Sequence, residues 1–296
     1  MDTKKKKVLF DTDIGSDIDD AVALAYLLRQ PMCELVGITT VTGDTVKRAQ
    51  LASVLCLAAG KGDVPIYPGC RMPLLDNELQ PHVPQADVLP LYNHQKEFPM
   101  HRHIQFMIDT IRANPGEISL LAVGPMTNIG LLFATDPEIP GLLKELVLMC
   151  GVFTNTLPRV GPREWNAYGD SHSTAIIYNT RPAVHRSIGL DVTCQVTMGS
   201  NEVRERFNVD LLKIVLTMAE IWFNRRSIIT FHDPLAASTL FDESICGFER
   251  GKVDVELLSD RVRGMTYFKA DKENGPHEVA LRVNKEKFFE HYFSLF

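Results

Sequence analysis

The chain has 296 residues, of which 45% are hydrophobic and 23% are charged, so it can bury a large core without disulfides. Its 31 Lys and Arg residues against 37 Asp and Glu residues leave a formal net charge of -6, which gives no electrostatic reason to bind nucleic acid or an anionic membrane. No apolar run approaches the ~18 residues that a membrane-spanning helix needs. These properties favour a small-molecule partner.

The six cysteines are scattered and include no Cys-x-x-Cys pair, so they indicate buried thiols rather than a zinc or redox motif. The N-terminus carries lysines that run directly into a strand-like segment, and it lacks the hydrophobic stretch of a signal peptide. We therefore expect a cytoplasmic protein.

Strand and helix patterns alternate along more than half of the chain. Residues 8–10 predict a short strand, and residues 21–28 predict a helix that stops before Pro31. Further strands are predicted at residues 35–41, 64–67, 118–123 and 146–150, and further helices at residues 46–59, 104–113, 128–134 and 173–178. Such alternation indicates an α/β protein, a single domain over residues 1–296, with a mainly parallel sheet and helices on both faces. Active sites of such folds lie beyond the carboxyl ends of the strands.

The remaining segments are less regular. Residues 73–100 contain five prolines and little periodicity, and long irregular loops of this kind are often functional or mobile, so this segment is a candidate lid. Residues 202–229 are expected to be mostly helical, with a further element at residues 233–240. Strand-like patterns at residues 253–258, 265–269 and 279–283 precede a terminal helix.

An acidic loop, residues 11–20, places five carboxylates directly after the first strand and before the first helix. Their mutual repulsion calls for a cation, and hard carboxylate oxygens select Ca²⁺ or Mg²⁺ over softer metals. One or two of them could instead favour the helix N-terminus through capping and the helix dipole. The loop therefore predicts a site for a divalent cation.

Other families of metal-binding loop fit less well. An EF-hand would carry Gly at its sixth position and Glu at its twelfth, where this loop, counted from Asp11, has Ser16 and Val22, so an EF-hand is excluded. A haloacid dehalogenase-type phosphatase also has Asp-x-Asp after its first strand, with a carboxylate nucleophile and Mg²⁺ nearby. It would need a later acidic pair and a phosphate-binding Lys, which do not stand out here. The acidic loop alone leaves a Mg²⁺-dependent phosphohydrolase open.

The end of the acidic loop, Asp19-Asp20-Ala21, resembles the nucleoside hydrolase family, and six further segments resemble that family in the same order. They are residues 38–43, 64–66 with Gly69, 123–128, 148–151, 164–166 and 232–234. Such an ordered set is hard to explain by chance. The resemblance implies a Rossmann-like nucleoside hydrolase fold and Ca²⁺-dependent hydrolysis of the N-glycosidic bond of ribonucleosides, giving ribose and free base.

The resemblance also implies a metal site and its catalytic groups. Asp13 would be both a Ca²⁺ ligand and the general base, and Asp20, Asp233 and the backbone carbonyl of Val123 would be further ligands. A metal lowers the pKa of a bound water, and a neighbouring carboxylate completes its deprotonation. His232 is predicted to protonate the departing base, because imidazole titrates near neutral pH.

Substrate contacts follow from the same resemblance. Asp19, Glu164 and Asn166 would bind the sugar, and nearby carboxylates would stabilise the positive charge that develops at the anomeric carbon. Asp44 stands where many relatives have an Asn that binds ribose. His82, in the irregular segment, is predicted near the base.

The chain departs from the family pattern in the acidic loop. Two more residues separate Asp13 from Asp19 than in the short form of this loop in the family, and Ile14 stands in place of the usual proline. Asp17 is therefore a rival metal ligand. Departures around Asp44 and after residue 82 keep a second hypothesis open, a nucleoside- or ribose-binding protein without turnover. Related proteins are often homodimers or homotetramers, so a homo-oligomer is expected.

Overall fold

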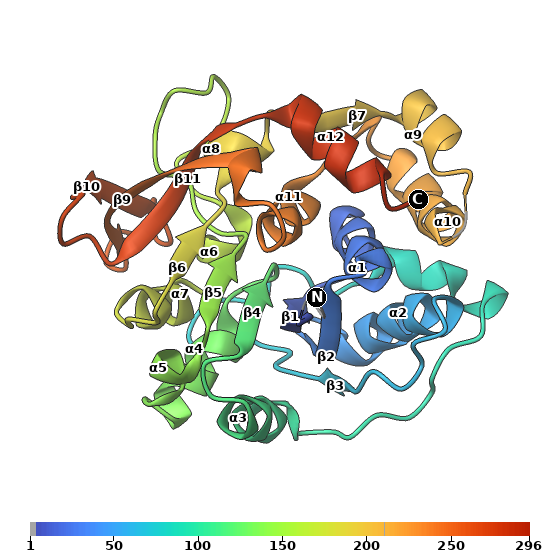
Figure 1. The fold of residues 1–296 in the computed structure, drawn as a ribbon, viewed down its shortest axis with the longest axis horizontal. Coiled ribbons are helices and arrows are strands. Elements are labelled where there is room, and N and C mark those ends of the chain that lie inside the picture. The colour runs from blue at the N-terminus through green and yellow to red at the C-terminus, as the bar shows by residue number, and fades with distance from the viewer. Residues whose placement is uncertain (1–3, 210) are drawn as a thin grey trace.

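The computed structural model describes residues 4–209 and 211–296. Within them, a central nine-stranded sheet contains β1 (Lys6–Thr12), β2 (Cys33–Thr40), β3 (Ile66–Pro68), β4 (Ile118–Ala122), β5 (Glu145–Leu148), β6 (His185–Ser187), β9 (Cys246–Val255), β10 (Thr266–Ala270) and β11 (His277–Val283). The strand order is β10-β9-β11-β6-β5-β4-β1-β2-β3 (Figure 1). Neighbours from β11 to β3 are parallel, while β9 is antiparallel to both β10 and β11. This confirms the predicted α/β class with a mainly parallel sheet.

Helices cover both faces of the sheet. Val8 and Phe10 of β1 belong to one hydrophobic cluster and Leu9 to another, because successive side chains of a strand point to opposite faces. The first cluster includes side chains of α1 (Asp19–Arg29), α2 (Thr45–Ala58), α10 (Leu212–Phe223), α11 (His232–Thr239) and α12 (Lys285–Phe293). The second includes side chains of α3 (His103–Ala113), α4 (Thr127–Thr135), α5 (Ile139–Leu142) and α7 (Ser171–Tyr178). The prediction of two covered faces is confirmed.

Two predicted boundaries in the C-terminal third were wrong. In the range 202–229, of which residue 210 lies outside the described residues, α9 (Ser200–Arg206) and α10 are separate, and β8 (Ile228–Thr230) pairs with β7 (Thr197–Gly199). Strand β9 begins at Cys246 rather than at residue 253, because Gly247 and Gly251 weaken the strand signal. A Cβ atom at Gly251 would lie 2.3 Å from the carbonyl oxygen of Lys269, so glycine is needed for β10 to approach.

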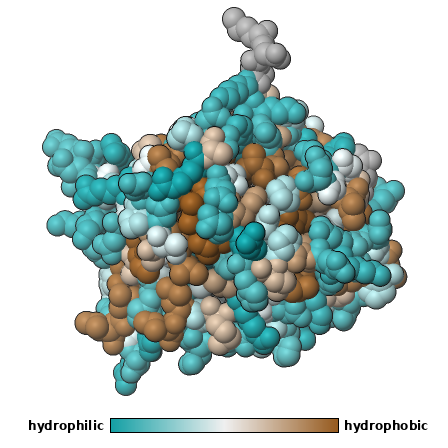
Figure 2. Space-filling model, turned by 90° about the horizontal axis from the view of Figure 1, so that it is seen from below, coloured by the Kyte–Doolittle hydropathy of each residue, from teal (hydrophilic) through white to brown (hydrophobic). Residues whose placement is uncertain are grey.

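The surface mixes polar and apolar side chains. Figure 2 shows one face, on which hydrophilic residues are interspersed with hydrophobic areas. Exposed large hydrophobic side chains include Leu75, Leu91 and Leu258. Exposed apolar side chains at separate positions are ordinary on proteins. Within the described part of the chain, every helix is too short or too polar to cross a membrane.

Candidate active site

The candidate site lies at the carboxyl edge of the parallel strands. The acidic loop follows β1, and Val123 follows β4, the strand that pairs with β1. The third segment of the site is the start of α11, a helix that packs against α1. Three segments far apart in the sequence therefore meet where α/β sheets usually bind their ligands.

Three carboxylates form the centre of this site. Oxygen atoms of Asp19, Asp20 and Asp233 all lie within 4.8 Å of one another, and each residue is only 3% exposed. The backbone N–H of Asp233 donates a hydrogen bond to Oδ2 of Asp19 at 3.2 Å, which joins α11 to the start of α1. Burial, together with the neighbouring negative charges, raises the pKa of all three carboxyl groups well above their usual range. A cation bound among these carboxyl groups would favour their ionised form, because it offsets their mutual repulsion. The cluster can therefore hold a metal ion.

Asp13 lies beside this cluster. Its backbone N–H donates to Oδ1 of Asp20 at 3.1 Å, and its own Oδ2 accepts a hydrogen bond from Nε2 of Gln80 at 3.1 Å. Burial raises the pKa of Asp13, and the nearby charge of Arg48 partly opposes that shift. Asp13 is therefore joined to the cluster through its backbone N–H, and the negative charge of its carboxyl group contributes to the raised pKa of Asp20 and Asp233.

A buried arginine supports the acidic loop from behind. The Arg48 guanidinium donates hydrogen bonds to the backbone carbonyls of Asp13 and Ile14, the latter at 3.1 Å, and its Nε donates to the carbonyl of Thr42 at 2.7 Å. Arg48 has no exposed surface. Its positive charge offsets part of the repulsion among the carboxylates, and its hydrogen bonds fix the backbone of the lengthened loop.

Val123, Asn166 and Glu164 form the neighbouring wall. The Asn166 Nδ2 donates to the carbonyl of Val123 at 2.6 Å and to the carbonyl of Met149 at 3.0 Å. Glu164 caps α6 (Trp165–Gly169) by accepting the backbone N–H groups of Asn166 at 2.6 Å and Ala167 at 2.9 Å, and it also accepts the N–H of Gly151 at 3.0 Å. Burial raises the pKa of Glu164 to about 7, against the lowering effect of these donors. The structure therefore brings Val123 and Asn166 together, and Glu164 positions the helix that carries Asn166.

His232 begins α11, directly before Asp233. Its Nδ1 lies 2.7 Å from the hydroxyl oxygen of Thr193. Burial lowers the pKa of His232 to about 4, so the ring is neutral at pH 7. This corrects the expectation of titration near neutral pH, because the sequence does not reveal how far the imidazole is removed from water.

Three other predicted residues, Asp17, Asp44 and His82, do not belong to the buried group of Asp19, Asp20 and Asp233. Asp17 is half-buried and its Oδ1 accepts the N–H of Ile18 at 2.6 Å. Asp44 caps α2, accepting the N–H of Lys47 at 3.1 Å and pairing with the Lys47 ammonium at 3.5 Å. His82 is exposed, and its backbone carbonyl accepts a hydrogen bond from the Ser16 hydroxyl at 3.4 Å. Their roles toward metal, ribose and base stay predictions.

Sequence reasoning missed Gln80 and Arg48. An arginine between Val46 and Leu51 on an otherwise apolar helix face was a signal that a buried anion or carbonyl needs a partner. Gln80 gave no signal, because its contact with Asp13 depends on the path of an irregular segment.

The fold and the site together define an α/β protein with a buried acidic cluster that can hold a metal ion. A family model described as inosine-uridine preferring nucleoside hydrolase matches residues 8–290. The inosine-uridine preferring nucleoside hydrolase of Crithidia fasciculata is 30% identical over 303 residues, covering 96% of this chain and 95% of that protein. The probable uridine nucleosidase 1 of Oryza sativa subsp. japonica is 30% identical over 272 residues, covering 85% and 82% of the two chains.

Solved structures agree at the level of the fold. A purine-preferring ribonucleoside hydrolase from Gardnerella vaginalis has a TM-score of 0.83 at 22% identity, and the plant nucleoside hydrolase PpNRh1 has a TM-score of 0.81 at 24% identity. Each covers 98% of this chain and 98% of its own. The chain belongs to the inosine-uridine preferring nucleoside hydrolase family.

Proposed function

We propose that this nucleoside hydrolase cleaves the N-glycosidic bond of ribonucleosides to ribose and free base with a Ca²⁺ ion held by Asp13, Asp20, Asp233 and the carbonyl of Val123. The observation that carries the proposal is the buried group of Asp19, Asp20 and Asp233, whose oxygens lie within 4.8 Å of one another. Buried carboxylates at this spacing repel one another unless a cation or protons intervene. Membership of the nucleoside hydrolase family supports the same reaction.

The donor set fits a hard cation. It consists of carboxylate and carbonyl oxygens, without thiolate or imidazole. Ca²⁺ accepts a larger number of oxygen ligands than Mg²⁺ does, and it accepts them in a less regular geometry. A cation bound there would neutralise the carboxylates and polarise a water molecule for attack on the sugar. The Arg48 guanidinium is already engaged with backbone carbonyls behind the loop, which leaves most of the negative charge uncompensated.

The surrounding residues have distinct roles in this proposal. Asp13 accepts the proton of the attacking water, and the hydrogen bond from Gln80 orients its carboxylate. Asp19 and Asn166 bind ribose hydroxyls. Glu164, the N-cap of α6, also binds a ribose hydroxyl. The carboxylates stabilise the positive charge that develops at the anomeric carbon in the transition state.

His232 serves the leaving group as a neutral hydrogen-bond donor. We assign the Thr193 hydroxyl as the donor to Nδ1, which places the proton of the neutral ring on Nε2. An Nε2–H group donates to a ring nitrogen or carbonyl of the departing base and stabilises its developing negative charge. The depressed pKa of His232, about 4, keeps the ring in this form at pH 7.

Uridine and inosine are the proposed substrates, since the matching family and relatives carry those names. We also propose a homo-oligomer, a dimer or tetramer, and a cytoplasmic location. The location is supported by six cysteines that are all free thiols, as a reducing compartment would keep them.

The reaction is tested by product analysis. Purified protein is incubated with inosine, uridine, cytidine and adenosine, and with uridine 5′-monophosphate as a matched phosphate ester, and released base, reducing sugar and phosphate are measured. We expect equal amounts of base and reducing sugar from at least one nucleoside. Phosphate release without base would indicate a phosphohydrolase, and nucleoside binding without any product would indicate a binding protein; either result contradicts the proposal.

A further inference from the structure

The irregular segment 72–80 approaches the candidate site at its C-terminal end. Gln80 donates a hydrogen bond to Oδ2 of Asp13 at 3.1 Å. The backbone of Gln80 lies close to Gly43, where a Cβ atom would be 2.2 Å from the Gln80 carbonyl oxygen. Gly43 also has a φ of 62°, in the region that favours glycine. Gln80 therefore ends the segment in contact with both Asp13 and Gly43, and residues 72–79 set the path by which the chain reaches it.

The middle of the segment is held at Asp76. Its Oδ2 accepts hydrogen bonds from the backbone N–H and the hydroxyl of Ser171, at 2.9 and 2.7 Å. Two residues earlier, the N–H of Leu74 donates to Oδ2 of Asp170 at 2.8 Å. These bonds attach the segment to the N-terminus of α7, where Asp170 is the N-cap.

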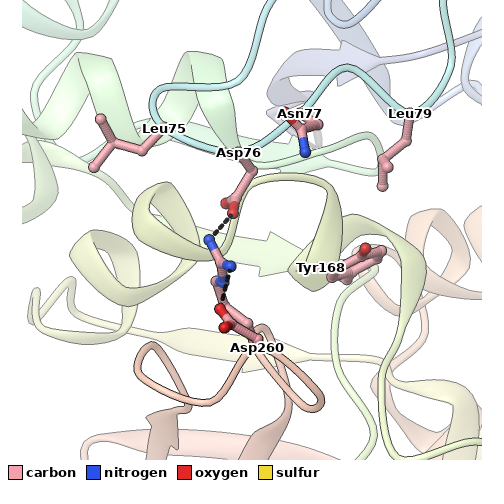
Figure 3. Close-up of a pocket in the computed structure, with 7 residues that line it drawn as sticks. Leu75, Asp76, Asn77, Leu79, Tyr168 and Asp260 are labelled. Carbon is pink, nitrogen blue, oxygen red and sulfur yellow. Dashed lines mark hydrogen bonds and ion pairs between the residues drawn. The ribbon is translucent and has the colours of Figure 1, made fainter.

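A distant arginine completes this attachment. Nη1 of Arg263 lies 3.2 Å from Oδ1 of Asp76, and its Nη2 lies 3.0 Å from Oδ1 of Asp260. Dashed lines in Figure 3 mark these interactions at Asp76 and Asp260. The Asp76 side chain is 9% exposed and that of Asp260 is 92% exposed. A carboxylate removed from water depends more on its cationic partner than a solvated one does. Arg263 therefore joins a nearly buried carboxylate, that of Asp76, to an exposed one, that of Asp260.

This cross-link lies behind the wall of the site rather than inside it. Residues Leu75, Asp76, Asp260 and Arg263 line a pocket together with Tyr168 (Figure 3). Tyr168 and Asn166 are two positions apart on α6, and such residues point to opposite sides of a helix. Asn166 reaches the carbonyl of Val123, so Tyr168 and the pocket lie on the outer side of α6.

We propose that Arg263 is a positioning residue of the reaction, which acts through Asp76 to hold segment 72–80 so that Gln80 orients Asp13. The inference rests on the proposed function, because it assigns Asp13 the role of general base. Arg263 touches neither the acidic cluster nor the proposed substrate contacts in the structure, and its effect passes through the segment. Small displacements of catalytic groups cost large factors in rate, so a remote residue can matter here.

A double-mutant cycle in the full-length protein tests this route. Arg263→Ala and Gln80→Ala are each expected to lower kcat/KM for the best nucleoside about tenfold, and the double variant to lower it about tenfold rather than about a hundredfold, because both changes remove the same alignment. Arg263→Lys retains the charge and is expected to recover part of the loss. Arg261→Ala, the same substitution at an exposed position of the same loop, is the matched control and should stay within about twofold of wild type.

Amide hydrogen exchange of peptides covering residues 72–80 gives a readout that needs no turnover. Exchange is expected to be faster in Arg263→Ala than in wild type or Arg261→Ala, because losing the Arg263–Asp76 contact makes opening of the whole segment easier, including the part where the Leu74 N–H is bonded to Asp170. Unchanged exchange would overturn the proposal, as would a hundredfold loss in the double variant or full activity of Gln80→Ala. If the wild-type protein released no base, the proposed function would fail, whereas unchanged exchange with normal turnover would refute the role of Arg263 alone.

Discussion

Asp13→Ala is expected to lower kcat for nucleoside hydrolysis by about 10³-fold and to weaken Ca²⁺ binding at the same time. The reason is that the proposed function gives one carboxylate two tasks: accepting the proton of the attacking water, and holding the cation together with Asp20, whose Oδ1 accepts the backbone N–H of Asp13 at 3.1 Å. Steady-state kinetics measure the first loss, and calorimetric titration of the metal-free protein with Ca²⁺ measures the second.

Asp17→Ala tests the rival ligand in the same experiment, since it removes the same charge from the same loop. Asp17 is half-buried, and its carboxylate is engaged by the N–H of Ile18 at 2.6 Å. We expect its Ca²⁺ affinity and kcat to remain within about threefold of wild type, as for a charge that is not a ligand. Near-normal turnover of Asp13→Ala, or loss of Ca²⁺ binding in Asp17→Ala alone, would show that the ligand assignment is wrong.

His232→Ala is expected to reduce kcat for inosine or uridine by about 10²-fold and to leave hydrolysis of p-nitrophenyl riboside within about threefold of wild type. A natural base leaves with negative charge that the Nε2–H group stabilises, while p-nitrophenolate leaves without such help. Parallel kinetics on the two substrates measure the difference. Equal losses on both would indicate that His232 only positions neighbouring groups.

The pH dependence gives a second check on His232. Burial lowers the pKa of His232 to about 4, so the ring gains its proton only as the pH falls through that value. Between pH 5 and 8 the ring stays neutral, and the wild-type rate profile should show no limb that belongs to this residue. A limb near pH 6.5 that disappears in His232→Ala would contradict the neutral-donor role.

The sequence predicted the location of the site better than its inner contacts. A strand that ends in Asp-x-Asp and is followed by a helix places the acidic loop at the carboxyl edge of the sheet, because the strand and helix patterns there are local. Asp233 could be joined to that loop only through the family resemblance. Its contact with Asp19 depends on the packing of α11 against α1, which local periodicity does not specify.

Burial accounts for most of what the sequence did not reveal. The pKa values of His232 and Glu164 are shifted chiefly because both side chains are removed from water, and that follows from tertiary packing. Gln80 reaches Asp13 through a segment without regular structure, so its contact has no periodic signature. The glycines of β9 likewise weakened the strand pattern in the sequence. One of them, Gly251, is required for β9 and β10 to lie close together.

Family membership narrows the hypotheses that the acidic loop had left open. A Mg²⁺-dependent phosphohydrolase shared only the Asp-x-Asp motif, whereas the nucleoside hydrolase family matches residues 8–290. The departures around Asp44 and after residue 82 involve no member of the buried group of Asp19, Asp20 and Asp233. Asp44 caps α2, and the His82 side chain is exposed, so neither departure disturbs the buried group of carboxylates.

Calcium dependence of base release is the most direct test of the central claim. Bound calcium and base release from the best nucleoside are measured on one protein sample before chelation, after chelation and after adding back Ca²⁺ or Mg²⁺. We expect about one Ca²⁺ per chain, loss of base release on chelation, and recovery with Ca²⁺ to a greater extent than with Mg²⁺. Full base release from protein shown to be free of metal would contradict the account.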